Sequence, residues 1–341
     1  MKHAYHILPL ALAAAVLAGC ERKELEPEVQ GGNRISLRAG VEEIKTPGHS
    51  RAAFTGQTPS AENPLSAAVW FTSETGSYPE TLPQGWDAQL WRECNIPCHT
   101  SISFTGTGAT FPQTGDDILT PMYPQDGRTV YCVGLYPGEG WSVEGNTWGT
   151  ARHAISGQED IMLAPQTQGS WTSHFTRQNY RHLLTWLKIC VCATTPQAGE
   201  YWGEVQKITL RGTADEVSVD LRGEDGEGWS PQDYVSFLGN SDLTVTDRGG
   251  EGGIPLKITA QEVGEVFCRP ASSYTLQLTC GKVATTDITV NLKALGGDAQ
   301  LLSYPAGLQY VVTLYFHPYN VVEGVCTLEA WNAQHEDLYP L

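Results

Sequence analysis

Residues 33–51 read NRISLRAGVEEIKTPGHSR, and this stretch indicates the type of fold that the chain adopts. Its first half alternates between apolar side chains and polar or small ones. A two-residue period of this kind is typical of a β-strand with one buried face. The apolar face carries Ile35, Leu37, Ala39 and Val41, and the other face carries Ser36, Arg38 and Gly40. A polar loop that ends at Arg51 follows the strand.

Similar segments recur along the chain, and almost none has a helical period. Clusters of Gly, Pro, Asn and Asp between them mark turns. Short alternating segments predict antiparallel sheets, so the predicted fold class is all-β, with antiparallel β-sandwich domains. The segments are 65–72, 128–135, 182–193, 205–210, 217–221, 274–280, 288–292, 308–316 and 325–331.

The length of 341 residues exceeds that of one typical domain and predicts two. The polar segment 194–199 follows the strongest strand and is the predicted boundary. It separates an N-terminal sandwich at residues 34–194 from a C-terminal sandwich at residues 200–341.

The first twenty residues predict export. Lys2 precedes an apolar run over residues 7–17, which is too short to span a bilayer stably and is typical of a signal peptide. The run ends in Leu-Ala-Gly-Cys, which resembles the lipobox of bacterial lipoproteins, where the cysteine is lipidated. We therefore predict a signal peptide at residues 1–19, a lipid such as palmitate on Cys20, and a disordered acidic tether at residues 20–33. The predicted location is the cell surface, anchored in the outer membrane.

The formal net charge is −17, from 38 acidic and 21 basic residues. Such a balance repels phosphate backbones, so no nucleic-acid partner is expected. The chain after the signal has no apolar run of about 18 residues, which leaves the lipid as the only predicted anchor.

The segment from Cys94 to His99 has the spacing C-x-x-x-C-H, one residue longer than the c-type haem motif. No second Cys or His pair follows at zinc-finger spacing. A local disulfide or two free thiols is the preferred interpretation, and no cofactor or metal is expected. Core filling is expected for the cysteines in or beside strands, although an oxidising compartment would permit pairing: Cys132, Cys190, Cys192, Cys268, Cys280 and Cys326.

Other residue types that carry chemistry form no recognisable site. Asp116-Asp117 and the acidic cluster 224–227 are interpreted as solvated turns, since neither matches a calcium loop. The short motifs of hydrolases, kinases and dehydrogenases are missing, so no enzyme is expected. A glycosidase leaves no such motif and stays a minor hypothesis. Four histidines are scattered over different segments: His153, His174, His182 and His317. Of these, His182 and His317 flank apolar runs and are expected to be packed or to lie at strand edges.

Several segments, taken in order, resemble the fimbrillin family, the lipoprotein pilins of type V fimbriae in Bacteroidetes. They are 34–43 with Arg51, 67–71 (AAVWF), 130–137 (VYCVGLYP), 160–164 (DIMLA), 182–189 (HLLTWLKI) and a closing strand that ends at Trp331. The resemblance implies two transthyretin-like β-sandwich domains and a subunit of a fimbrium, or pilus, that serves cell adhesion.

The resemblance also implies a route of assembly. An arginine-specific protease cuts in the loop after the first strand, and another fimbrial subunit supplies a replacement strand in a head-to-tail polymer. By this resemblance Arg51 is the processing site, and Ile35, Leu37, Ala39 and Val41 belong to the released strand. A cut at Arg34 would leave the strand in place, and Arg38 is expected to be shielded by pairing.

Two points stay open at this level. If the last strand is the donor, it must include residues 325–331; otherwise the subunit accepts a strand without giving one, as a tip or anchor subunit would. The alternative function is a surface lipoprotein that binds glycans without polymerising, through loop aromatics such as Trp141, Trp148 and Trp171. Host or bacterial surface ligands are the partners that an adhesin of either kind would have.

Overall fold

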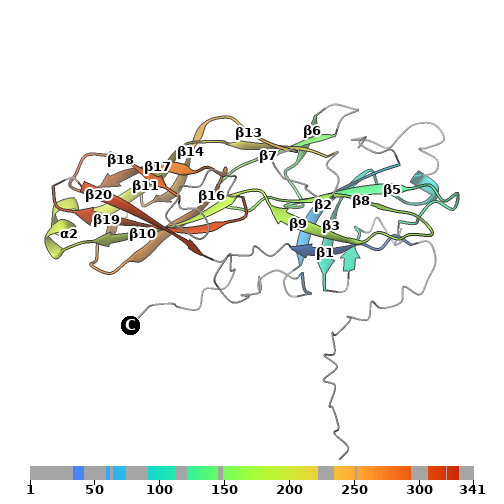
Figure 1. The fold of residues 1–341 in the computed structure, drawn as a ribbon, viewed down its shortest axis with the longest axis horizontal. Coiled ribbons are helices and arrows are strands. Elements are labelled where there is room, and N and C mark those ends of the chain that lie inside the picture. Colours follow the sequence, from blue (N-terminus) through green and yellow to red (C-terminus); the bar gives the residue numbers. More distant parts are fainter. Residues whose placement is uncertain are drawn as a thin grey trace, which may run out of the picture. The chain divides into compact units, whose positions relative to one another are not determined.

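Strands provide nearly all of the regular structure that a computed structural model of the chain describes (Figure 1). The described residues are 34–41, 59–61, 64–73, 91–106, 108–112, 121–144, 149–221, 234–249, 252–292, 306–319 and 321–329. They belong to one compact unit, Asn33–Leu341. The all-β prediction is confirmed. None of the helices in these ranges is long and apolar enough to cross a membrane.

The largest sheet is built from the N-terminal part of the chain and has seven strands. Their order is β1 (Arg38–Val41), β9 (Arg177–His182), β8 (Met162–Gly169), β5 (Val130–Tyr136), β2 (Leu65–Thr72), β3 (His99–Thr105) and β4 (Gly108–Thr110). The β1–β9 pair is parallel and the other pairs are antiparallel. β1 therefore ends the sheet order. Its neighbour β9 lies about 140 residues later in the sequence, so no hairpin joins the two strands and a parallel pairing is possible.

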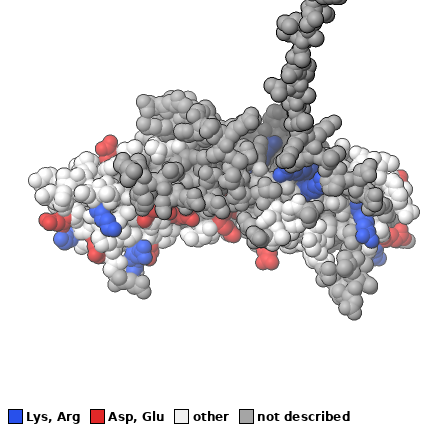
Figure 2. All heavy atoms as spheres, turned by 90° about the horizontal axis from the view of Figure 1, so that it is seen from below, with Lys and Arg blue, Asp and Glu red and all other residues white. Residues whose placement is uncertain are grey.

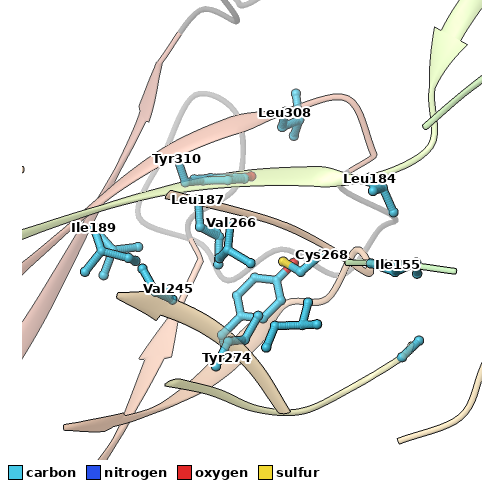
Figure 3. Packing of buried hydrophobic residues seen from close by; sticks show 14 of the residues in the cluster. Ile155, Leu184, Leu187, Ile189, Val245, Val266, Cys268, Tyr274, Leu308 and Tyr310 are labelled. Atoms are coloured by element: carbon cyan, nitrogen blue, oxygen red, sulfur yellow. The ribbon is translucent and has the colours of Figure 1, made fainter. Parts of the chain in front are cut away.

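Two sheets form a sandwich in the C-terminal part. One has the order β16 (Gln261–Cys268), β10 (Thr185–Ala193), β19 (Gln309–His317) and β20 (Val321–Glu329). The other has the order β14 (Ser241–Asp247), β11 (Glu204–Thr213), β17 (Ser273–Cys280) and β18 (Thr286–Asn291), with β15 (Ile254–Pro255) beside β11. Figure 3 shows Leu187, Val266 and Tyr310 of the first sheet facing Val245 and Tyr274 of the second.

A fourth sheet takes strands from both parts of the chain. Its order is β13 (Val235–Leu238), β12 (Glu216–Asp220), β7 (Thr150–Ala154) and β6 (Ser142–Glu144). The antiparallel β12–β7 pair joins two segments that are about 65 residues apart in the sequence. Backbone hydrogen bonds therefore tie the two parts together.

The predicted boundary at residues 194–199 stays a prediction, and the strand pairing bears on it. Residue 196 begins the helix α2 (Pro196–Trp202), with the Thr195 side chain accepting from the Ala198 nitrogen as its N-cap. The predicted boundary places β10 in the first domain, whereas both of its sheet neighbours, β16 and β19, come from the second. The β10–β19 pair is parallel, unlike the antiparallel pairs that the sequence predicts.

The seven-stranded sheet is buried on both faces, which explains why β2 reads as an almost continuous apolar run. One face forms the N-terminal core, which contains Ile35, Leu37, Leu65, Ala67, Val69, Phe71, Trp91, Cys94, Ile96, Ile102, Phe104, Tyr123, Val130, Cys132, Met162, Ala164, Phe175 and Tyr180. The opposite face contributes Ala68, Trp70, Val133 and Leu135 to a larger core that continues into the C-terminal sandwich.

A buried polar trio lies inside the N-terminal core. The Gln178 amide nitrogen donates to the Cys132 sulfur over 3.1 Å, and the Tyr180 hydroxyl donates to the Gln178 amide oxygen over 3.3 Å. All three side chains are fully buried, and burial raises the pKa values of the Cys132 thiol and the Tyr180 hydroxyl. The trio is neutral and mutually bonded, which is how a polar group is tolerated in a core.

We expect Gly134→Ala to lower the free energy of unfolding by about 1–3 kcal/mol, because a methyl group there would overlap the Tyr180 hydroxyl and lie 3.1 Å from the Gln178 amide oxygen. Urea denaturation measures the loss. Gly281→Ala is the matched control, since its nearest neighbour would be 3.7 Å away. Equal stability of the two variants would contradict the packing around the trio.

Candidate strand-exchange site

Residues 34–41 lie along the edge of the N-terminal core. The Ile35 nitrogen donates to the Pro121 carbonyl over 2.7 Å, and the Ala109 nitrogen of β4 donates to the Leu37 carbonyl over 2.9 Å. From Arg38 onward the segment pairs with β9. Among the described residues, a ladder of backbone bonds thus holds β1 on one side only, and separate bonds hold the segment before it on the other side.

The register of β1 on β9 determines which side chains face the core. Ala39 pairs with Gln178 and Val41 pairs with Tyr180, so both lie over the buried polar trio. Arg38 and Gly40 alternate with them on the opposite face. The alternation predicted from the sequence is thus present in the pairing.

The four apolar residues of the segment are buried to different degrees. Ile35 is 2% exposed and Leu37 is fully buried. Ala39 and Val41 are half-buried and pack against the N-terminal core. Full burial of an aliphatic side chain contributes about 1.5–3 kcal/mol, so the leading half of the segment supplies most of its attachment.

The end of β1 also contacts the C-terminal sandwich. Val41 packs against Trp186 of β10, whose ring stacks on Phe267 at a centroid distance of 5.4 Å. The Trp186 indole nitrogen donates to a Glu265 carboxylate oxygen over 3.1 Å, and the Lys188 ammonium lies 4.8 Å from the ring centroid. Val41 therefore contacts Trp186, a side chain that Phe267, Glu265 and Lys188 also contact.

The outer face of the β1–β9 pair carries like charges. Arg38 lies opposite Arg177 in the register, a pairing that is unfavourable between adjacent strands. The Arg177 guanidinium lies over Gly40, where a methyl group would overlap it. Gly40 gives this guanidinium room, and the charge pair weakens the trailing half of the segment.

Several residues predicted from the sequence lie outside the described residues. These are Cys20, the processing residue Arg51, Trp148, the pair Asp116-Asp117 and the acidic cluster 224–227. Of the other two loop tryptophans, Trp171 is 40% exposed, whereas Trp141 is half-buried and donates to the Pro137 carbonyl over 2.8 Å.

The Cys94–His99 segment carries two buried thiols and no disulfide. Burial raises the pKa of Cys98 to about 11, which keeps the thiol protonated at neutral pH. The His99 ring stacks on Trp70 at 4.4 Å. Within the described ranges, no three His, Cys, Asp or Glu side chains come together to hold a metal ion. Core filling is confirmed for the buried Cys132, Cys192, Cys268, Cys280 and Cys326, and Cys190 is half-buried.

Two histidines lie beside carboxylates in the structure. His182 Nδ1 lies 2.6 Å from Asp160 Oδ2, and its side chain is 1% exposed. His317 Nε2 lies 3.7 Å from Glu323 Oε2. The sequence pattern did not predict either pair, because strand pairing brings each carboxylate close to its histidine: β8 pairs with β9 near His182, and β19 pairs with β20 near His317.

Charged residues on the described surface are interspersed. Figure 2 shows small separate groups of Lys and Arg, with Asp and Glu between uncharged areas, on the face that it presents. Ion pairs on the described surface include Lys207 to Asp247 over 2.7 Å and Arg211 to Asp242 over 2.9 Å. This face offers no continuous basic stripe over its described residues.

Comparison with known proteins shows a shared fold. A candidate cell adhesion protein from Bacteroides uniformis has a TM-score of 0.52 at 14% identity, over 89% of this chain and 99% of that chain. A candidate cell adhesion protein from Bacteroides ovatus has a TM-score of 0.50 at 14% identity, over 90% and 100%. A fimbrial protein from Bacteroides vulgatus has a TM-score of 0.42 at 12% identity, over 88% and 99%. No family model and no curated protein matches the sequence.

We expect Leu37→Ala to lower the free energy of unfolding by about 2–5 kcal/mol, because it opens a cavity in the N-terminal core. Ser36→Ala, at an exposed neighbouring position, should change it by no more than about 0.5 kcal/mol. Urea denaturation followed by tryptophan fluorescence distinguishes the two variants. A small loss in Leu37→Ala would show that this segment does not fill the core in solution.

Proposed function

We propose that the chain is a subunit of a surface fimbrium that assembles by protease-triggered strand exchange and contributes to cell adhesion. One observation carries the proposal: residues 34–41 fill the N-terminal core with Ile35 and Leu37, yet among the described residues β1 has a strand ladder on one side only. Such a segment can leave without breaking the other pairs of its sheet. The role proposed is structural and not enzymatic.

Departure of the segment would leave a site with a strong preference for another strand. The edge of β9 would present unpaired N–H and C=O groups, which are costly to leave without partners. The space vacated by Ile35 and Leu37 would be an apolar groove. An extended segment from a neighbouring subunit supplies both main-chain hydrogen bonds and alternate apolar side chains.

Two other features support the surface role. The fold is shared with two candidate cell adhesion proteins of Bacteroides, whose names agree with the class proposed. The lipobox-like segment ending at Cys20 provides an outer-membrane anchor for the subunit before assembly. The partners are other fimbrial subunits and an arginine-specific protease.

The end of β20 is the donor that we propose, because its sequence repeats the pattern of the first strand. Residues 35–39 (ISLRA) align with residues 326–330 (CTLEA). Each position holds the same type of side chain, apolar, hydroxyl or small, except that Arg38 aligns with an acidic residue, Glu329. β20 ends its sheet order beside β19. Donation would exchange the end of the β19–β20 ladder for a ladder on β9 of the neighbour, with Leu328 in the space of Leu37.

The one difference between the two segments favours the donor. In the native register Arg38 lies opposite Arg177, and in the aligned register Glu329 takes the place of Arg38. A like-charge pair would become an opposite-charge pair, which stabilises adjacent strands. The incoming strand would thus bind β9 without the repulsion that the resident strand experiences.

We expect an arginine-specific protease to remove the segment before Ala52 from the mature protein and to produce filaments. Arg51→Ala should remain uncut at this position and stay monomeric, whereas Lys45→Ala in the same segment should behave as wild type. Mass spectrometry of the new amino terminus and electron microscopy measure the two effects. Filaments formed by the uncut Arg51→Ala variant would contradict the proposed trigger.

We expect a synthetic peptide of residues 322–333 to bind the processed protein, and Glu329→Arg in the peptide to weaken binding by about 3- to 10-fold. The protein variant Arg177→Glu should restore the affinity of the altered peptide. Glu323→Arg, outside the aligned register, is the control. Equal affinity of the wild-type and Glu329→Arg peptides would refute the proposed register. It would not refute strand exchange, which the protease experiment tests separately.

A further inference from the structure

Three exposed apolar residues lie together where α2 meets the turn between β19 and β20. Tyr319 in the turn is 85% exposed, Val321 after it is 53% exposed, and Tyr201 of α2 is 38% exposed. The rings of Tyr201 and Tyr319 are 6.3 Å apart with an interplanar angle of 54°. Figure 1 shows α2 beside β19 and β20, and none of these elements belongs to the strand-exchange site on the seven-stranded sheet.

Tyr319 is presented by a backbone conformation that L residues with large side chains rarely adopt. Its φ angle is +66°, in the left-handed region where glycine or asparagine is ordinarily found. The chain therefore accepts backbone strain and also leaves a large ring in water. Strained residues of this kind cluster at ligand sites, where the surrounding structure holds them.

The aromatic pair stands on a rigid base. The Tyr201 ring meets the edge of Trp202 at 6.0 Å, and Trp202 is fully buried and packs on Phe316 at 5.2 Å. The Trp202 indole nitrogen donates to the His317 carbonyl over 2.6 Å. Both the helix and the turn are thus fastened to the same buried indole, and the pair has a fixed platform.

Residues close in sequence to the two tyrosines carry hydrogen-bonding groups. His317 precedes the turn and faces Glu323 of β20, whose carboxylate is 66% exposed. The Lys282 ammonium donates to the carbonyl of Glu200, next to Tyr201. The tyrosine hydroxyls add further donors and acceptors. The patch is a small apolar centre with a polar rim.

The size of the patch decides between partner classes. Aromatic side chains offer about 150–250 Å² each, so two partly exposed tyrosines present roughly 200–300 Å². A stable protein interface needs about 800 Å² on each partner, which this surface does not approach. One face of a sugar ring is apolar and of matching size, and its hydroxyls would reach the polar rim.

We propose that Tyr201 and Tyr319 form a glycan-binding site that stacks on the apolar face of a pyranose ring. The site is complete within one chain. It uses α2, the turn after β19 and the start of β20, whereas the proposed strand exchange uses the end of β20 and the edge of β9, so the two proposals are tested separately. Through this site the protein would bind a surface glycan, whether it is a fimbrial subunit or a monomeric surface protein.

The test is a titration of the full mature chain with cellohexaose, mannohexaose, chitohexaose and galactohexaose at millimolar concentrations, followed by saturation-transfer NMR. We expect at least one probe to bind, with saturation strongest on ring protons of one sugar face. Tyr201→Ala and Tyr319→Gly should each weaken binding about tenfold or more, and Tyr319→Trp should retain it. Trp171→Ala, which removes a 40% exposed aromatic ring elsewhere, is the matched control.

Thermal unfolding adds a second readout. Tyr319→Gly should keep or raise the unfolding temperature while losing the ligand, because glycine adopts positive φ without strain. Binding of none of the four probes, or equal binding by Tyr319→Gly, overturns the proposal. So does self-association that these two tyrosine variants abolish, since the patch would then be an interface between copies of the chain.

Discussion

The N-terminal half depends on one segment, residues 34–41. It buries its own Ile35 and Leu37 in the core, although its only strand ladder in the described part of the chain is with β9. The two side chains complete a core whose other members come from strands distant in sequence. Their attachment is mainly apolar, and apolar contact is non-directional, so another chain with the same side-chain spacing can provide it. The main-chain hydrogen bonds to β9 also do not depend on which side chains the strand carries. The segment therefore completes the core, and under the proposed exchange a strand with the same pattern would replace it.

The division into two cores limits what loss of that segment would disturb. No residue of 34–41 belongs to the larger core, whereas Ala68 and Trp70 on the opposite face of β2 do. The seven-stranded sheet consequently has a second set of contacts that does not involve β1. The shared sheet of β13, β12, β7 and β6 adds backbone bonds between the two parts of the chain. Strand exchange at one edge is compatible with an otherwise intact molecule because of these contacts.

The sequence predicted the features that depend on residues close together in the chain, such as the positions of strands and their buried faces. Alternation located β17 and β19, in which every second residue is buried, and it placed Ile35 and Leu37 on the buried side of the first strand. It did not predict the parallel β1–β9 and β10–β19 pairs or the β12–β7 pair, because a strand's period says nothing about its partner. The contact of His182 with Asp160 and the exposure of Tyr319 depend equally on tertiary packing. The tyrosine's only signal was its place in a turn, which does not distinguish a solvated ring from a packed one.

The uneven attachment of the first segment sets an order of release under the proposed exchange. Its leading half holds the fully buried Leu37 and the Ile35–Pro121 bond, whereas its trailing half has half-buried Ala39 and Val41 and the opposed arginines at 38 and 177. Under this proposal, a cut after Arg51 would free the chain on the trailing side. Peeling would then begin at Val41, where it also removes a contact with Trp186, and the deep apolar pockets would open last. An incoming strand could pair with the freed end of β9 before Leu37 leaves, so that the core is never wholly exposed to water.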